Sequence, residues 1–398
     1  MNEINWAINR DKVESAVSDL KNLPGDKEME DTANYFCKFE LYRPTPLYKL
    51  DSLSSKLGVD GIYIKDESVR FGLKAFKVLG GFYAVSECLA QKMGKNLSST
   101  AFEELRSKKT ADIIGNITFA CATDGNHGLG VAWTASQLGY KAVVYLPAGS
   151  SHKRVENIAA QGAKVIVTDK NYDDTVRIAV NDAVKNGWCI IQDTVWEGYE
   201  EIPFSILRGY SVIGWEILRQ IMDYGLSKPT HIFIQAGVGT LAAAIIRFFT
   251  AVFPEAPPVM AIVEPKTADC IYKSVKTGKL TGVGGDLSTI MAGLACGEPN
   301  PDAWKIIRRY CSAVFSVPDS IAEKGMRIYA NPLSGDKRII SGESGAVTLG
   351  LVAELLENNS YAAIRNDLQI NQHSNIILIN TEGDTDPDSY AKIVEGKS

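Results

Sequence analysis

Lys77 has the surroundings most suggestive of covalent chemistry. It lies between Phe76 and Val78 and shortly before the pair Gly80 and Gly81, so its amine is expected at an apolar, closely packed helix start. Burial disfavours the ammonium form, and a neutral amine is the form that condenses with an aldehyde. The pattern therefore predicts a Schiff-base lysine. The alternative is a helix-start lysine whose stem covers apolar surface while its ammonium stays in water.

A second candidate is the polar turn at residues 123–128, which reads Thr-Asp-Gly-Asn-His-Gly. It follows an expected strand at 117–122 and opens a helix. The carboxyl ends of parallel strands are where α/β sheets bind ligands, so the turn predicts a binding or catalytic site. The alternative is that Thr123 or Asp124 only caps the helix.

The third candidate is a glycine loop between a strand and a helix. Residues 235–240 read Gln-Ala-Gly-Val-Gly-Thr. Backbone N–H groups of such a loop can close on an anion, and the following helix N-terminus adds partial positive charge. The loop lacks the lysine of a P-loop and the full dinucleotide-binding motif, which indicates a single phosphate group. A plain strand-to-helix turn is the alternative.

The elements that must position these residues alternate between strand and helix. Short apolar runs separated by helices of about ten residues are typical of parallel strands covered on both faces. The pattern predicts an α/β fold with two mostly parallel sheets covered by helices. The expected strands are 117–122, 141–146, 163–168 and 188–192 in one series, and 232–235, 259–263 and 375–380 in a second.

Composition restricts the class of protein. The chain has 398 residues, 45% of them apolar and 22% charged, with a formal net charge of −5. The length predicts two domains, and the charge gives no basic footprint for nucleic acid. No apolar run is long enough to span a bilayer and the first residues show no signal-peptide pattern. We therefore expect a cytoplasmic protein with no nucleic-acid or membrane partner.

Together these three stretches resemble a family. The F-K-x-x-G-G context of Lys77, the turn at 123–128 and the loop at 235–240 are similar in type and order to pyridoxal-phosphate enzymes of the tryptophan-synthase-β fold (fold type II), which include threonine dehydratases and serine racemases. Within that group the chain most resembles the diaminopropionate ammonia-lyases. Similar segments extend from residues 43–47 to residues 381–386, which covers nearly the whole chain.

The resemblance implies a carbon–nitrogen lyase with pyridoxal 5'-phosphate as cofactor. The expected reaction is α,β-elimination of D- and L-2,3-diaminopropionate to pyruvate and ammonia, a step of amino-acid catabolism. Relatives are usually homodimers. The resemblance also implies a large cofactor-binding domain, 1–80 plus 195–398, a small domain, 81–194, and an active site between them.

The resemblance further implies one role per position. Lys77 would form the Schiff base, and Gly237, Val238, Gly239 and Thr240 would bind the cofactor phosphate. Asn126 would meet the ring hydroxyl and, with Thr123, the substrate carboxylate. Thr381 would place a hydroxyl against the pyridine nitrogen. A hydroxyl leaves the ring a weaker electron sink than a carboxylate would, which favours loss of a β substituent over transamination.

Two carboxylates carry the expected specificity. At Asp124, serine racemases and dehydratases usually have a serine or another small residue. Asp124 could remove the α proton from the D-isomer while Lys77 removes it from the L-isomer; alternatively, it only pairs with the substrate β-ammonium. Asp193, which follows the expected strand 188–192, is assigned to binding the β-amino group or tuning Asp124. A turn cap is its alternative.

No metal site is expected. Racemase-type relatives bind a divalent cation through a glutamate, which Glu264 matches, and a later aspartate, whose position falls on Cys270. A thiol is a poor ligand for a hard cation. The seven cysteines show no metal-binding spacing, and we expect Cys270 and Cys296 to be core thiols rather than a disulfide.

Two other functions stay open at this point. The chain could be a serine or threonine dehydratase of the same fold, or a non-catalytic protein that binds pyridoxal phosphate or an amino acid. The carboxylates Asp124 and Asp193 favour an enzyme, because a binding protein has no need of them.

Overall fold

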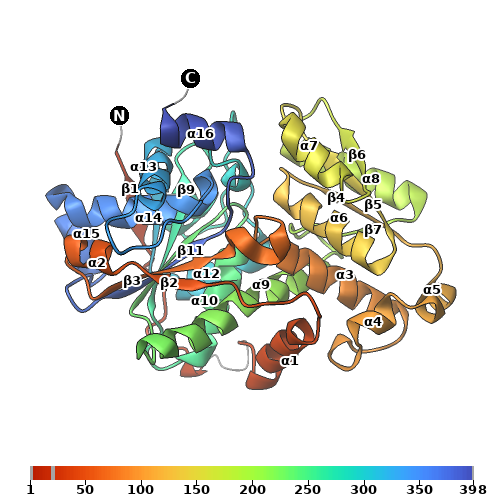
Figure 1. The fold of residues 1–398 in the computed structure, drawn as a ribbon, viewed down its shortest axis with the longest axis horizontal. Coiled ribbons are helices and arrows are strands. Elements are labelled where there is room, and N and C mark those ends of the chain that lie inside the picture. The colour runs from red at the N-terminus through yellow and green to blue at the C-terminus, as the bar shows by residue number, and fades with distance from the viewer. Residues whose placement is uncertain (1–2, 19–22, 397–398) are drawn as a thin grey trace. The chain divides into compact units, whose positions relative to one another are not determined.

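The structure is a computed structural model that describes residues 3–18 and 23–396 (Figure 1). It forms two compact units. Unit 1 comprises Met1–Gly25, Pro44–Lys74 and Ile213–Ser398, and unit 2 comprises Asp26–Arg43 and Ala75–Val212. This division differs from the expected domains, because residues 26–43, 75–80 and 195–212 join the second unit instead of the larger one.

Aromatic packing explains why residues 26–43 belong to unit 2. Helix α1 (Asp26–Cys37) carries Phe36, and Phe39 follows it. Their rings lie 5.3 and 4.8 Å from that of Phe82 in α3 (Val78–Lys92). Burying large aromatic rings is among the strongest stabilising contributions in a core, so this amphipathic segment is bound to α3. The sequence pattern gave no sign of which sheet it would join.

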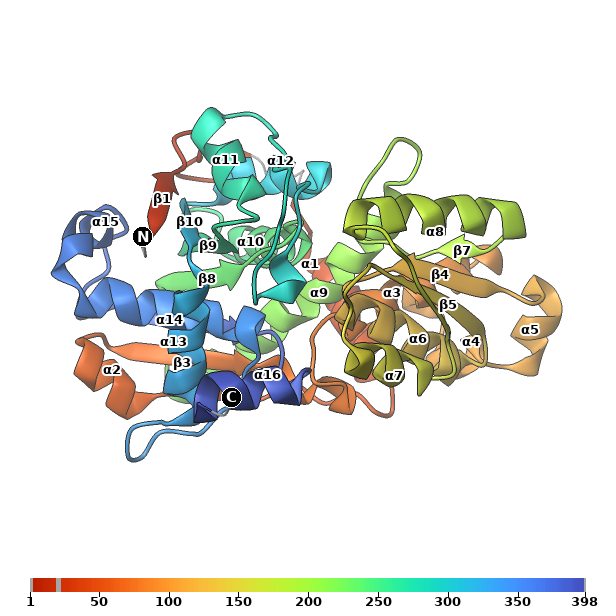
Figure 2. The same ribbon diagram turned by 90° about the horizontal axis from the view of Figure 1, so that it is seen from above.

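Unit 2 contains a four-stranded parallel sheet in the order β6-β5-β4-β7. Helices α6 and α7 cover one face and α8 the other (Figures 1 and 2). The expected alternation of strands and helices in this series is confirmed, although the last strand is much shorter than expected. The elements are β4 (Thr118–Ala122), α6 (Asn126–Leu138), β5 (Lys141–Leu146), α7 (His152–Ala159), β6 (Lys164–Val167), α8 (Tyr172–Asn186) and β7 (Cys189–Ile190), preceded by α4 (Phe102–Leu105) and α5 (Lys108–Ile114).

Glycines let helix α3 approach its neighbours closely. A Cβ atom at Gly130 of α6 would lie 2.6 Å from Val78 Cα, and one at Gly209 would lie 2.5 Å from Leu79 O. Gly209 belongs to α9 (Glu201–Gln220), whose first part lies in unit 2. Any larger residue would force the backbones apart. These contacts fix the start of α3, which is where Lys77 lies.

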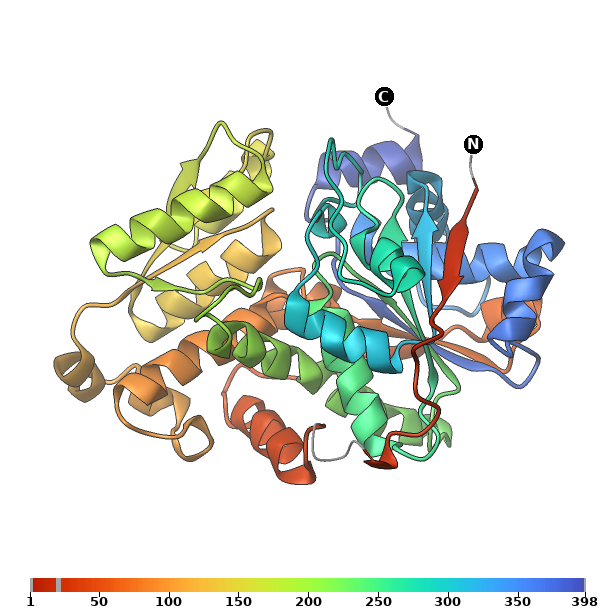
Figure 3. The ribbon, with the colours of Figure 1, turned by 180° about the vertical axis from the view of Figure 1, so that it is seen from behind.

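Unit 1 contains a seven-stranded sheet in the order β1-β10-β9-β8-β11-β3-β2. The five inner strands are parallel, while β1 and β2 pair antiparallel at the two edges. Figure 3 shows β1, in red, at its edge. The strands are β1 (Asn5–Ile8), β2 (Leu47–Lys49), β3 (Gly61–Asp66), β8 (His231–Gln235), β9 (Val259–Pro265), β10 (Ala313–Val317) and β11 (Asn375–Asn380).

Helices cover both faces of this sheet (Figures 1 and 3). Helix α14 packs against β8 and β11 and along α13, while α10 packs against β8 and along α12. Among the described residues, no helix is long and apolar enough to cross a membrane. The helices are α2 (Asp51–Leu57), α10 (Thr240–Val252), α11 (Cys270–Thr277), α12 (Pro301–Tyr310), α13 (Asp319–Ala330), α14 (Glu343–Glu357), α15 (Ala362–Asp367) and α16 (Pro387–Glu395).

Candidate active site

Lys77 lies where the sequence predicts, immediately before α3, as its N-cap residue. Its side chain is 16% exposed. The ring of Phe76 packs 4.8 Å from that of Tyr210, and a Cβ atom at Gly80 would lie 2.6 Å from the Ile206 side chain. The stem of Lys77 therefore leaves a closely packed, apolar helix start, as expected.

The nitrogen of Lys77 has an anionic environment that the sequence did not predict. Its Nζ lies 3.5 Å from Asp193 Oδ2 and 3.9 Å from Asp124 Oδ1. The amine therefore has two carboxylates beside it, so the expectation of an apolar setting was incomplete. Asp193 is only 5% exposed. Burial alone would raise the pKa of Asp193, but the positive charge of Lys77 and the hydrogen bonds that the carboxylate accepts outweigh it and lower that pKa. Asp193 is therefore ionised.

The backbone that carries Asp193 is held by side-chain hydrogen bonds. Tyr199 Oη accepts from Gln192 N at 2.8 Å and donates to Ile190 O at 2.9 Å. Gln192 Oε1 accepts from Ala122 N at 3.0 Å, which ties the end of β7 to the end of β4. Asp193 thus projects from a fixed strand end. Tyr199 was missed at the sequence level because a single hydroxyl beyond a strand leaves no periodic signal.

His127 adds a further tie between these segments. It is buried in α6, and its Nε2 lies 2.8 Å from Ile191 O. Burial lowers the pKa of His127, so the neutral ring donates from Nε2 to that carbonyl. The imidazole therefore joins the start of α6 to the segment that carries Asp193.

The polar turn at 123–128 divides into structural and chemical parts. Thr123 Oγ1 accepts from Gly125 N at 2.9 Å and from Gly128 N at 3.1 Å. This is the capping role that the sequence left open for Thr123. Asp124, 22% exposed, instead faces the Lys77 amine. Asn126 is the first residue of α6 and is half-buried. The cofactor and substrate contacts expected of Thr123 and Asn126 stay predictions.

The glycine loop of unit 1 fits a phosphate group. A Cβ atom at Gly237 would lie 3.0 Å from Cys296 Sγ. Gly239 has a φ of +96°, and a Cβ atom there would lie 3.0 Å from the Ile271 side chain. Val238 lies between these glycines, and Thr240 begins α10. The first N–H groups of a helix lack intrahelical acceptors, so they are suited to phosphate oxygens.

Asn300 supports the same loop and was not singled out from the sequence. Its N–H donates to Val238 O at 2.8 Å, and its Nδ2 lies 3.3 Å from Thr240 Oγ1. The residue is buried and also caps α12 through Oδ1. A lone Asn-Pro step reads as an ordinary helix start, so no pattern connected Asn300 with the loop.

Thr381 follows β11, and its hydroxyl is oriented by Gln235. Gln235 Nε2 lies 2.7 Å from Thr381 Oγ1 and 3.0 Å from Ile379 O, and both side chains are buried. Because Thr381 Oγ1 accepts from the amide, its own hydrogen is available to another acceptor. An unprotonated pyridine nitrogen requires such a donor, so the pair suits the role expected of Thr381.

Glu264 caps a helix in place of the metal-binding role known in similar enzymes. Its carboxylate accepts from Ile271 N at 2.9 Å and from Tyr272 N at 2.7 Å, at the start of α11. Burial raises its pKa to about 8. Cys270 lies 3.6 Å away through Sγ. Among the described residues no three His, Cys, Asp or Glu side chains gather as a metal site, and the cysteines, Cys270 and Cys296 included, are free thiols.

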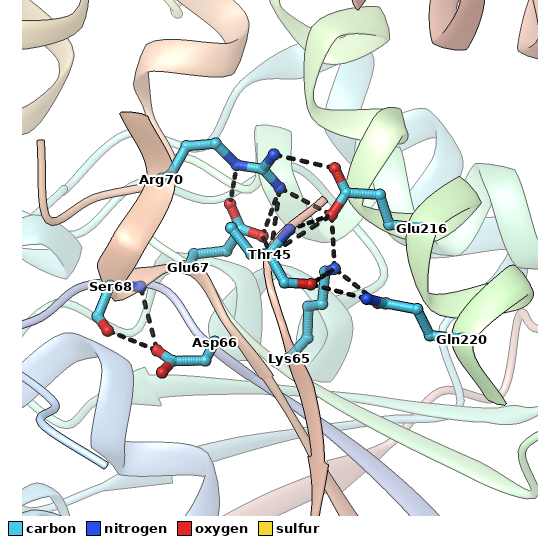
Figure 4. Close-up of polar contacts among 8 residues, drawn as sticks. All are labelled: Thr45, Lys65, Asp66, Glu67, Ser68, Arg70, Glu216 and Gln220. Atoms are coloured by element: carbon cyan, nitrogen blue, oxygen red, sulfur yellow. Dashed lines mark hydrogen bonds and ion pairs between the residues drawn. The ribbon is translucent and has the colours of Figure 1, made fainter. Parts of the chain in front are cut away.

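A buried ionic network in unit 1 holds the segment that leads to Lys77 (Figure 4). Arg70 Nε lies 2.8 Å from Glu67 Oε2, and its Nη1 lies 2.9 Å from Glu216 Oε1. Lys65 Nζ lies 2.7 Å from Gln220 Oε1 and also pairs with Glu216. The four charged side chains, Lys65, Glu67, Arg70 and Glu216, are fully buried. Two cations thus balance two anions.

The network accompanies an unusual backbone. Phe71 and Lys74 have φ of 48° and 59°, in the left-handed region that non-glycine residues rarely adopt. Such conformations persist where surrounding contacts over-determine them. The sequence gives no sign of this burial, because a short stretch of mixed charges at 65–68 has no pattern that separates buried from exposed side chains.

Comparison with known proteins agrees with this arrangement. The family model described as "Pyridoxal-phosphate dependent enzyme" matches residues 38–366. Diaminopropionate ammonia-lyase of Escherichia coli strain K12 is 47% identical over 357 residues, 89% of this chain and 88% of that protein. The E. coli enzyme in complex with D-serine superposes with a TM-score of 0.92 at 43% identity, covering 100% of this chain and 98% of that one. The same enzyme in complex with an aminoacrylate-PLP azomethine reaction intermediate superposes with a TM-score of 0.90 at 42% identity, with the same coverage of both chains.

Proposed function

We propose that this chain, which belongs to the pyridoxal-phosphate-dependent enzymes and within them to the diaminopropionate ammonia-lyase family, eliminates ammonia from 2,3-diaminopropionate. One water is consumed, and the products are pyruvate and two ammonia molecules. The observation that carries the proposal is the Lys77 amine facing the carboxylates Asp124 and Asp193, at 3.9 and 3.5 Å, in a chain 47% identical to an enzyme of that name.

The residues present fit pyridoxal phosphate. Lys77 supplies the amine for its aldehyde, and the loop Gly237, Val238, Gly239 and Thr240 supplies phosphate donors without side-chain obstruction. Asn126 and Thr381 supply polar groups for the ring hydroxyl and ring nitrogen. When bound, the cofactor accepts the electron pair left at the α-carbon after its proton departs.

Proton movement is assigned to three side chains. Lys77 would remove the α proton of the L-isomer. Asp124 removes it from the D-isomer, because its carboxylate lies 3.9 Å from the Lys77 amine and a carboxylate can act as a general base. Asp193, buried and ionised, pairs with the substrate β-ammonium and so favours diaminopropionate over serine. Thr123 and Asn126 orient the substrate carboxylate.

The same proposal includes the setting of the enzyme. We infer a cytoplasmic homodimer that takes a small amino-acid substrate and binds neither nucleic acid nor membrane. The net charge of −5 supports the absence of a polyanionic partner. Size-exclusion chromatography with light scattering tests the dimer, and a monomer mass would refute that part.

The experiment measures ammonia and keto acid released from D- and L-diaminopropionate, D-serine and L-threonine by the cofactor-loaded protein. The wild-type protein should turn over diaminopropionate faster than D-serine or L-threonine. Lys77→Ala should lose at least about 1,000-fold in kcat. The matched control is Asp174→Asn, since Asp174 is a half-exposed carboxylate of the same unit paired with Arg177.

Asp124→Asn separates the two roles of that carboxylate. Loss of a D-specific base should lower kcat about 100-fold for the D-isomer and change the L-isomer by less than about fivefold. Loss of β-ammonium pairing would instead raise KM equally for both isomers. Preferred turnover of serine or threonine would show a dehydratase. An absorbance change on adding amino acid, without ammonia or keto acid, would show a binding protein.

A further inference from the structure

Two cysteines of unit 2 lie in contact although they are 101 residues apart in the sequence. Cys88 is in α3 and Cys189 begins β7, and their Sγ atoms are 3.0 Å apart. A disulfide requires about 2.05 Å between the sulfurs, so closing the gap needs a movement of about 1 Å. Neither residue has a role in the proposed reaction.

We propose that Cys88 and Cys189 form an oxidative modification site, which becomes a reversible disulfide when the enzyme meets a small-molecule disulfide such as oxidised glutathione. The geometry favours this pair because its two Sγ atoms already lie 3.0 Å apart. An isolated thiol would stop at a mixed disulfide, whereas an adjacent second thiol displaces the small molecule.

Exposure sets the order of the two thiols. Cys189 is half-buried, whereas Cys88 is 6% exposed. The hydrogen bond from Cys88 lowers the pKa of Cys189, and the ammonium of Lys92 acts in the same direction. Cys189 is therefore the thiolate that reaches the reagent first, and Cys88 is the resolving thiol.

The chemistry balances in two exchanges. Cys189 thiolate attacks one sulfur of the small disulfide, forming a mixed disulfide and releasing one small thiolate. Cys88 then loses its proton to solvent and attacks Cys189 Sγ, which releases the second small thiolate. The protein loses two electrons and the small disulfide gains them. Excess dithiol reverses both steps.

The bridge would connect the two elements that present the candidate catalytic groups. Helix α3 begins immediately after Lys77, and Asp193 lies four residues beyond Cys189. Because the required movement is small, we expect kcat to change by less than about twofold. Because the bridge closes a loop of about 100 residues, we expect Tm to rise by about 5 °C.

The test incubates the full-length, cofactor-loaded enzyme with oxidised glutathione. Thiol titration in denaturant should fall by two from the seven cysteines of the chain, and non-reducing peptide mapping should find Cys88 joined to Cys189. Tm should rise and return with dithiothreitol. Cys37→Ser, which removes an exposed thiol, is the matched control and should leave the bridge intact.

Cysteine variants distinguish a Cys88–Cys189 disulfide from oxidation that does not join these two residues. Cys88→Ser should retain glutathione on Cys189 and show no rise in Tm, and Cys189→Ser should show neither change. The inference is overturned if the wild-type protein holds only a mixed disulfide at Cys189, or if the rise in Tm persists in Cys189→Ser. Both variants exchange sulfur for oxygen at nearly equal volume, and circular dichroism confirms that they fold.

Discussion

Replacing Arg70 by methionine tests the buried network in front of Lys77. The guanidinium balances Glu67 and Glu216, with its Nη2 2.8 Å from Glu67 Oε1 and its Nη1 2.9 Å from Glu216 Oε1. Methionine retains much of the apolar stem, so the change removes charge and hydrogen bonds more than volume. It leaves two buried anions facing the single cation Lys65.

The expected cost follows from this imbalance. Removing one partner of a buried ion pair destabilises a protein by about 3–5 kcal/mol, because the remaining charge is unpaired. Arg70→Met should therefore lower the free energy of unfolding by about that amount. Adding Glu67→Gln restores neutrality, leaving the Lys65–Glu216 pair. The double variant should recover about 2 kcal/mol relative to the sum of the two single changes.

Urea unfolding followed by circular dichroism measures these values. The control is Arg308→Met, because Arg308 and its partner Asp11 are about half exposed; an exposed pair contributes about 0.5 kcal/mol. The reasoning is refuted if Arg70→Met costs less than about 1 kcal/mol, or if the double variant loses the full sum of the singles. Either result would mean that water or rearrangement compensates the buried charges.

Three further predictions concern pH, packing and the cofactor ring. The charges of Arg70 and Lys65 outweigh the effect of burial and lower the pKa of Glu216 to about 2, from an ordinary 4.5. The contribution of Glu216 to stability is therefore complete above pH 4.5 and is lost as the pH falls through about 2. As the pH is lowered, the urea midpoint of Glu216→Gln should fall less steeply than that of the wild-type protein. Gly130→Ala should lower the free energy of unfolding by about 2 kcal/mol and reduce cofactor occupancy, which the absorbance of the bound cofactor measures. An unchanged Tm would contradict the close contact between Gly130 and α3. Thr381→Val should reduce kcat about tenfold through one lost hydrogen bond with Tm nearly unchanged, and equal kcat would argue against contact with the ring.

The spacing of apolar residues, together with cap and turn residues, was sufficient to predict the regular part of the fold. The strands 141–146 and 375–380 begin and end where predicted, because apolar runs there are bounded by clear turns. Strand β10 (Ala313–Val317) was missed, since five residues between two helices can read as a connection. Strand β1 was also missed, because four residues are too few to show the alternation that marks a strand.

The candidate site divides in the same way. The position of Lys77 and the glycine loop could be predicted, because helix starts and glycine spacing are local features. The approach of Asp193 to Lys77 required knowing that β7 lies beside β4, and Tyr199 and Asn300 act through single long-range hydrogen bonds. Strand order and isolated contacts are not encoded in a local pattern.

Strand β1 has a consequence for how this protein tolerates trimming. Among the described residues it pairs with β10 alone, a buried strand of the sequence Ala-Val-Phe-Ser-Val, and so covers the hydrogen-bonding edge of that strand. Cutting the chain after Arg10 would leave an apolar row ready to recruit strands from other molecules. We therefore expect residues 5–8 to limit aggregation, although they lie far from Lys77 in the sequence.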